Sequence, residues 1–135
     1  MKRWLLLLIA LVIAVSALAV RSNARATARR EREIGYEGQL RTYSKALQLG
    51  ITRKELEDHL RLNNTSFGAI FTAYGGRRES QWADVVKIGE ESAPWYCSEA
   101  YVYIAFEFSG KEQFERNDSD VLERIELFRP YTGCL

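Results

Sequence analysis

The sequence has few of the residues that metal and redox sites need: its 135 residues include one histidine and two cysteines. A metal site needs several Cys, His, Asp or Glu side chains at ligand spacing. The chain has no C-x-x-C pair, and Cys97 and Cys134 are far apart in sequence. A site would therefore have to recruit His59 and a carboxylate from elsewhere in the fold. We expect no metal ion and no cofactor.

The main part of the chain also lacks an excess of basic residues. Residues 1–33 hold 7 of the 19 Lys and Arg but only 2 of the 18 Asp and Glu, which leaves 12 basic and 16 acidic residues in 34–135. A domain that binds nucleic acid through phosphate contacts needs a basic face. We therefore expect no nucleic-acid partner.

The N-terminus carries an uncharged apolar run from Trp4 to Val20, preceded by Lys2 and Arg3. The run is at the short limit for a helix that crosses the hydrocarbon core, and residues 4–20 are predicted to contact the membrane. Ala17-Leu18-Ala19 matches the small-x-small pattern of signal peptidase sites, so cleavage near Ala19 would release the protein. Residues 1–20 are thus either a signal peptide or a signal-anchor helix.

Residues 21–35 form an arginine-rich stalk, which we expect to be helical or disordered, and residues 36–135 form one small domain. The stalk arginines are Arg21, Arg25, Arg29, Arg30 and Arg32. They outnumber the two basic residues before the apolar run, and by the positive-inside rule this favours a cytoplasmic domain. The argument from the cysteines, given below, favours the opposite side.

Two short helices are predicted at the start of the domain. The first has an apolar stripe formed by Tyr36, Leu40, Tyr43 and Leu47 and ends at Gly50. The second begins with Thr52 and Glu55 at the spacing of a capping box, in which each residue bonds the backbone of the other.

After the helices, the apolar period changes to two. Strand-like runs occur at 65–76, where the run ends in a double-glycine turn, near Val85 to Ile88 inside a polar segment, at 95–108 and at 121–128. The third run places Val102, Ile104, Phe106 and Phe108 on a core face and, on a half-exposed face, the aromatics Trp95, Tyr101 and Tyr103 with Ala105 and Glu107. We predict an α+β fold in which two short helices pack on a three- to four-stranded antiparallel sheet.

The aromatic residues of the half-exposed face allow two interpretations. Trp95, Tyr101 and Tyr103 are a candidate partner patch, because aromatic side chains supply much of the binding energy at interface centres. Alternatively, the segment 75–94 covers them, with Trp82 packed on Tyr101. Trp95 shares the face only if the strand is unbroken back to residue 95.

Cys97 is predicted to form a disulfide with Cys134. An export-type N-terminus and an even cysteine count are typical of proteins in oxidising compartments. Closing a loop of this length would stabilise the domain by roughly 4 kcal/mol in the chain-entropy model. Thiol catalysis would instead require Cys97 beside His59, and the adjacent Glu99 would raise the thiol pKa, which disfavours the reactive thiolate. A small thiol enzyme or hydrolase using Cys97 and His59 is kept as an alternative.

The domain resembles the SmpA/OmlA family of small envelope proteins, which includes the lipoprotein subunit of the outer-membrane β-barrel assembly machinery. The resemblance lies in "LGITRKELEDHL", "WYC", "VYIAFEF" and "VLERIEL", with Gly50, Ile51, Thr52, Phe106, Val121 and Ile125 at the matching places. It implies two helices on one face of a three-stranded antiparallel sheet and a non-enzymatic adaptor role. The chain has no cysteine before Cys97 for acylation, and "LRLNNTS" replaces the usual Leu-Gly-x-Pro.

The sequence therefore predicts a non-enzymatic interaction or scaffold module with a protein partner in the cell envelope. We expect a single-pass protein of a bacterial inner membrane with its domain on the periplasmic side, or a periplasmic protein after cleavage. A protein-inhibitor domain is a further alternative.

Overall fold

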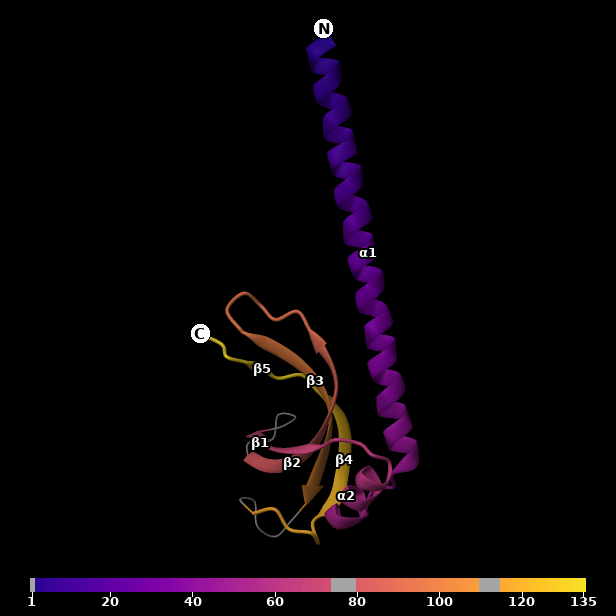
Figure 1. Ribbon diagram of the computed structural model, residues 1–135, viewed down its shortest axis with the longest axis vertical. Helices are drawn as coiled ribbons and strands as arrows, with labels where there is room; N and C mark the ends of the chain where they lie inside the picture. The colour runs from indigo at the N-terminus through magenta and orange to yellow at the C-terminus, as the bar shows by residue number, and fades with distance from the viewer. Residues whose placement is uncertain (1, 74–79, 110–114) are drawn as a thin grey trace. The chain divides into compact units, whose positions relative to one another are not determined.

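The computed structural model describes residues 2–73, 80–109 and 115–135, and the chain divides into two compact units, Met1–Gly35 and Tyr36–Leu135 (Figure 1). The first unit is helical throughout its described part. The second unit is an α+β domain that contains the end of the same helix, one short helix and an antiparallel sheet. The predicted fold class is therefore confirmed at this level.

Helix α1 runs from Lys2 to Ala46 without interruption. The sequence predicted three successive segments here, but the stalk is rich in alanine, arginine and glutamate, which favour helix, and contains no proline. By length and composition α1 can cross a membrane, a property that N-terminal signal sequences share.

Helix α2, Arg53–Leu62, begins with the capping box formed by Thr52 and Glu55. The Glu55 amide donates to Thr52 Oγ1 at 3.3 Å, and the Thr52 amide donates to Glu55 Oε2 at 2.7 Å. Leu56 and Leu60 lie one turn apart and are buried against the sheet. The local sequence thus determines both where α2 begins and which face packs.

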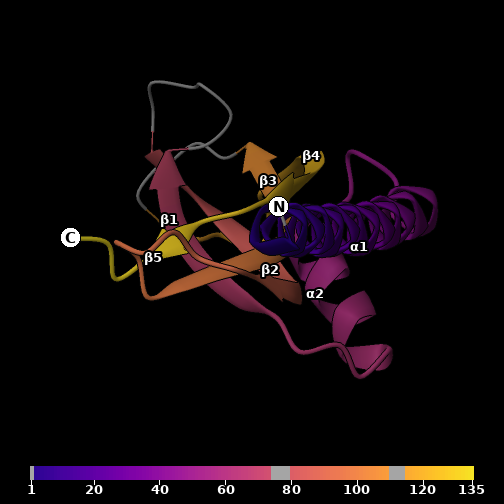
Figure 2. The same cartoon turned by 90° about the horizontal axis from the view of Figure 1, so that it is seen from above.

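The sheet has the strand order β1-β2-β3-β4, in which all neighbours are antiparallel, and a short β5 pairs with β3. The strands are β1 Gly68–Ala73, β2 Ser80–Glu91, β3 Glu99–Ser109, β4 Val121–Phe128 and β5 Tyr131–Thr132. Figure 2 shows the strands crossing one another at large angles, as expected for a strongly twisted sheet. The short strand predicted near Val85 to Ile88 is in fact twelve residues long.

One face of the sheet packs against the helices. Its core consists of Leu47, Leu56, Leu60, Val86, Ile104, Phe106, Phe108 and Leu122. Val121, the first residue of β4, is 37% exposed, whereas its neighbour Leu122 is buried. The cause is a register shift between β3 and β4: Phe106 pairs with Ile125, but Phe108 pairs with Leu122. A bulge of this kind changes which side chain faces the core.

The connection between α1 and α2 pairs with the outer edge of β4. The Gly50 amide donates to the Leu122 carbonyl, and the Leu122 amide donates to the Ile51 carbonyl, each at 2.8 Å. Thr52 forms an isolated antiparallel bridge with Val121. This edge strand therefore has backbone partners at its beginning, which fixes the start of α2 against the sheet.

The second face of the sheet is more buried than the sequence predicted. Ala83, Val85 and Ala105 form a small apolar cluster, against which Ile70, Tyr103 and Phe128 pack. Glu107 is fully buried on the same face, and its Oε2 lies 3.8 Å from Nε of Arg124 on β4. The expected half-exposed character of Ala105 and Glu107 was wrong, because the cross-strand neighbours cover both residues.

Candidate functional surfaces

The two cysteines form a disulfide between Cys97 and Cys134. Cys97 lies in the turn before β3, and Cys134 follows the short strand β5, which pairs with the beginning of β3. The predicted staple is therefore present, and it joins the end of the described chain to the sheet. The sulfur of Cys97 is bonded, so thiol chemistry at this position would first require reduction.

The disulfide closes a surface that we call the stapled tip, residues 92–98 and 130–135. Trp95 is 91% exposed, Tyr131 57% and Tyr96 45%. The rings of Trp95 and Tyr96 contact each other edge to face, with centroids 5.7 Å apart. Large, mostly exposed aromatic side chains thus gather at one end of the sheet. The disulfide joins the two chain segments that carry them.

The predicted set of Trp95, Tyr101 and Tyr103 divides in the structure. Strand β3 begins at Glu99, so the condition that placed Trp95 on the tyrosine face is not met. Trp82 packs on Phe71, its direct partner on β1, with the ring centroids 5.3 Å apart. The expected packing of Trp82 on Tyr101 was wrong. Trp82 lies on the same face of the sheet as Asp84, whereas Tyr101 lies on the opposite face, together with Val85. Residues 80–91 pair with β3 as a strand, while the first part of the expected cover, 75–79, lies outside the described residues.

Tyr101, Tyr103 and Lys87 form what we call the tyrosine row, which crosses β2 and β3 on the second face. The ring centroids of Tyr101 and Tyr103 are 5.9 Å apart, and Lys87 Nζ lies 4.0 Å from the centroid of Tyr101. Both tyrosines are half-buried, and Lys87 is exposed. A hydrogen bond with Glu99 raises the pKa of Tyr101 to about 12, so this phenol remains a neutral donor at physiological pH.

A buried group of charges, which we call the ionic cluster, lies at the other end of the sheet. It consists of Arg53 and Glu57 on α2, Asp84 on β2, and Arg116 and Asp120 before β4. Arg53 Nη1 lies 2.8 Å from Asp84 Oδ1, and Arg53 Nη2 lies 3.3 Å from Asp120 Oδ2. Arg116 Nη2 bridges Asp84 and Glu57 at 2.9 and 2.8 Å. Arg53 also covers the ring of Phe108 at 4.0 Å.

The ionic cluster holds its charges in mutual contact. Burial raises the pKa of Asp84 above its ordinary value, although Arg53 and Arg116 act in the opposite direction. The sequence analysis did not find these residues, since they come from three segments of the chain. One signal was available: an acidic residue inside the apolar alternation of β2 indicates a buried partner. We interpret the cluster as structural because its guanidinium groups already bind its carboxylates.

His59 and the acidic residues form no metal site in the part of the chain that the structure describes. His59 lies on α2, where its Nε2 is 3.2 Å from the side-chain nitrogen of Asn63, one turn later. Cys97 lies in the turn before β3 and is bonded to Cys134. His59 therefore contacts a residue of its own helix, and Cys97 is paired with Cys134 rather than with His59.

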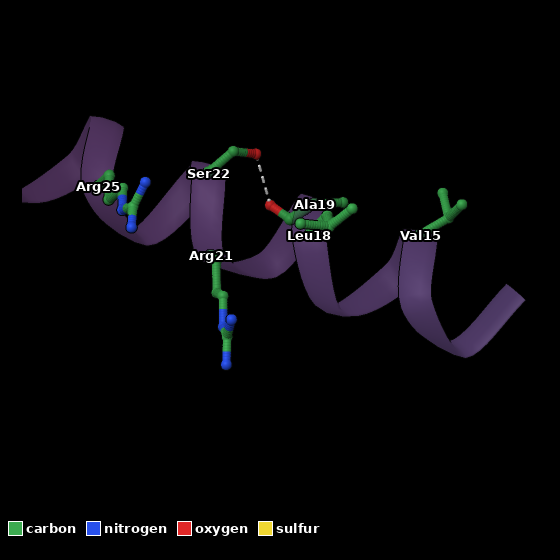
Figure 3. Close-up of a pocket in the computed structure, with 6 residues that line it drawn as sticks. All are labelled: Val15, Leu18, Ala19, Arg21, Ser22 and Arg25. Atoms are coloured by element: carbon green, nitrogen blue, oxygen red, sulfur yellow. Dashed lines mark hydrogen bonds between the residues drawn. The ribbon is translucent and has the colours of Figure 1, made fainter. Parts of the chain in front are cut away.

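A shallow depression on α1 lies where its apolar part meets the arginines (Figure 3). Its lining residues, Val15, Leu18, Ala19, Arg21, Ser22 and Arg25, all belong to this one helix. The Ser22 hydroxyl donates to the Ala19 carbonyl at 2.8 Å and is therefore used within the helix. The depression is a gap between successive side chains, and we assign it no ligand.

Comparison with known proteins adds no assignment: no protein-family model, curated protein or solved structure matches this chain.

Proposed function

We propose that the protein is a membrane-anchored interaction module of the bacterial cell envelope, with its domain on the periplasmic side of the inner membrane. The apolar α1 supplies the anchor, and a disulfide of this kind is typical of oxidising compartments. The resemblance to the SmpA/OmlA family implies the same non-enzymatic adaptor role. The domain would hold a protein partner near the membrane without a chemical reaction.

The tyrosine row is the observation that carries this proposal. Tyr101 and Tyr103 are half-buried aromatics in contact with each other, and the ammonium group of Lys87, which also pairs with Glu90, lies over the ring of Tyr101. Aromatic side chains at an interface contribute large contact area at a small entropic cost, and tyrosine also offers a polar hydroxyl. A protein surface with apolar and acidic groups would match this arrangement.

Site-specific photo-crosslinking in native membranes tests the proposed partner site. A photoreactive phenylalanine derivative replaces Tyr101 in the full chain, and in a control chain it replaces Leu62, which is 84% exposed on α2. We expect a discrete protein adduct from position 101 and none from position 62. The substitution Lys87→Glu, which removes the cation over the ring, should weaken the adduct.

The outcomes separate the candidate functions. Equal adducts from both positions, or none from position 101, would contradict a partner site at the tyrosine row. An adduct with a hydrolytic enzyme whose activity falls on binding would favour the inhibitor alternative. A thiol enzyme would require free Cys97, and thiol titration of protein taken from its native compartment measures that directly.

A further inference from the structure

The stapled tip combines exposed aromatic residues with a complete lack of charged side chains. Residues 92–98 and 130–135 contain no Asp, Glu, Lys or Arg, although 27% of all residues in the chain are charged. Tryptophan and tyrosine are enriched where proteins meet the membrane–water interface, because their rings are amphipathic. Trp95, Tyr96 and Tyr131 thus have the composition of an interfacial surface rather than that of an ordinary solvated loop.

Three backbone hydrogen bonds join groups within the stapled tip. The Cys97 amide donates to the Pro94 carbonyl at 2.9 Å, the Ser98 amide to the Thr132 carbonyl at 3.0 Å, and the Leu135 amide to the Tyr96 carbonyl at 2.9 Å. Backbone groups without partners are costly to move out of water into a lipid environment. The two segments of the tip therefore have fewer unpaired backbone groups than they would have without these bonds.

The chain enters the domain at the same end of the sheet as the tip. Tyr36, the first residue of the domain unit, is buried, and its ring lies directly against Gly89, where an added Cβ would be 2.6 Å from the phenol oxygen. Arg129 lies 5.9 Å from the centroid of the same ring. Gly89 lies three residues before the first tip segment, near the end of β2, and Arg129 directly precedes the second, so the tether attaches near the tip end of the sheet.

The tether is short in comparison with the domain. The stalk of residues 21–35 would span about 22 Å as a helix, at roughly 1.5 Å per residue. A domain of this size has a radius of gyration of about 13 Å, which for a compact sphere corresponds to a diameter of roughly 34 Å. A membrane that holds the apolar part of α1 is therefore within reach of the tip, and tethering replaces a weak bimolecular contact by an intramolecular one.

We propose that the stapled tip inserts into the interfacial layer of the membrane that anchors α1. This inference rests on the proposed membrane anchoring, and it names lipid as the partner of the tip, separate from the tyrosine row. Trp95 and its neighbours lie at the level of the headgroups, while the disulfide keeps the two tip segments together. The domain is then held at two points and is oriented with its tip end toward the bilayer.

Tryptophan quenching by brominated lipids tests this contact. The full chain is reconstituted in vesicles, and single-tryptophan variants report on each position. Trp4→Phe with Trp82→Phe leaves Trp95, and the two other pairs leave Trp4 or Trp82. Trp82 is the matched control, because it lies about 30 Å along β2 from the tip at roughly 3.3 Å per residue. Trp4, in the apolar part of α1, is the positive control.

We expect Trp95 to lose fluorescence with bromine near the headgroups and to shift to shorter wavelength, as Trp4 does, while Trp82 is unchanged. Quenching of Trp95 no stronger than that of Trp82 overturns the inference. Resistance of the chain to alkaline extraction measures the anchor independently. A chain that is retained without quenching at Trp95 keeps the proposed anchoring and loses only the tip contact. A chain that is extracted contradicts both proposals.

Discussion

The two ends of the sheet are held in opposite ways. The end that carries the ionic cluster is covered by α2 and by the segment before β4, and its stability depends on buried charges in contact with one another. The end that carries the stapled tip has exposed aromatics and is held by one covalent bond. Apolar side chains that stay exposed contribute little burial free energy to folding. The tip therefore depends on the disulfide for its rigidity.

The largest effect is expected from a change in the ionic cluster. Arg53→Ala removes the cation between Asp84 and Asp120 and leaves two carboxylates poorly compensated in a buried site. We expect the free energy of unfolding to fall by about 4 kcal/mol, the cost of breaking a buried ion pair. Denaturant unfolding of the full chain in detergent measures it. Lys54→Ala, which removes an exposed ion pair with Asp58, is the control and should leave the free energy of unfolding nearly unchanged.

At the opposite end, removal of the disulfide should have the next largest effect. Cys97→Ser with Cys134→Ser is expected to lower the free energy of unfolding by no more than the roughly 4 kcal/mol of the chain-entropy model, since the unfolded chain regains the freedom of the closed loop. Hydrogen exchange should increase mainly at residues 92–98 and 130–135. Equal loss of protection at α2 would mean that the two ends are not independent.

A third change tests the junction between the tether and the tip end. In Gly89→Ala the added methyl group would meet the ring of Tyr36, whose nearest atom would lie 2.6 Å away. We expect a loss of about 2 kcal/mol, typical of overpacking a filled site. Gly68→Ala on β1 is the matched control, because no atom lies within 4 Å of its new methyl group. A similar thermal shift in both variants would contradict a tight contact at Tyr36.

The smallest effect is expected at the start of α2. Thr52→Ala removes the acceptor of the Glu55 amide and should cost about 1 kcal/mol, seen as a lower denaturation midpoint with an unchanged slope. An unchanged midpoint would mean that the cap contributes nothing.

The cap also has a defined pH dependence. The Thr52 amide donates a hydrogen bond to the Glu55 carboxylate, and this bond is the main cause that holds the pKa of Glu55 below its ordinary value. The hydrogen bond from the Thr52 side chain acts in the same direction. The contribution of Glu55 to stability is therefore present above the pKa of the unfolded state and is lost as the pH falls through the folded-state pKa. The stability difference between the wild type and Glu55→Ala should shrink in acid, whereas a constant difference would exclude this origin.

The features that the sequence predicts well are those coded within a few residues. Thr52 and Glu55 are three positions apart, so their hydrogen bonds depend on one turn of helix and can be recognised without the fold. The alternation from Val102 to Phe108 likewise identifies a core face, and the apolar N-terminal run together with the two cysteines predicts their bond. Each pattern depends on local geometry or on a count.

The features that the sequence did not predict depend on pairing between distant segments. Arg53 and Asp84 are both charged and would be placed on the surface, and only their contact makes burial acceptable. The bulge that turns Leu122 inward arises from the register between β3 and β4. The fate of Trp95 depended on where β3 begins, which the turn and the disulfide determine together.

The pairing of the α1–α2 connection with β4 has a consequence for the order of folding. Gly50 bonds Leu122, and Arg53 bonds Asp120, so the start of α2 depends on residues near the far end of the chain. Closing so long a loop delays the first stable nucleus. A ribosome-bound chain that stops before residue 120 would lack these contacts and would stay unfolded. For the export proposed above, such an unfolded polypeptide would suit passage through a secretion channel, and the contacts at residues 120–122 would form after translocation.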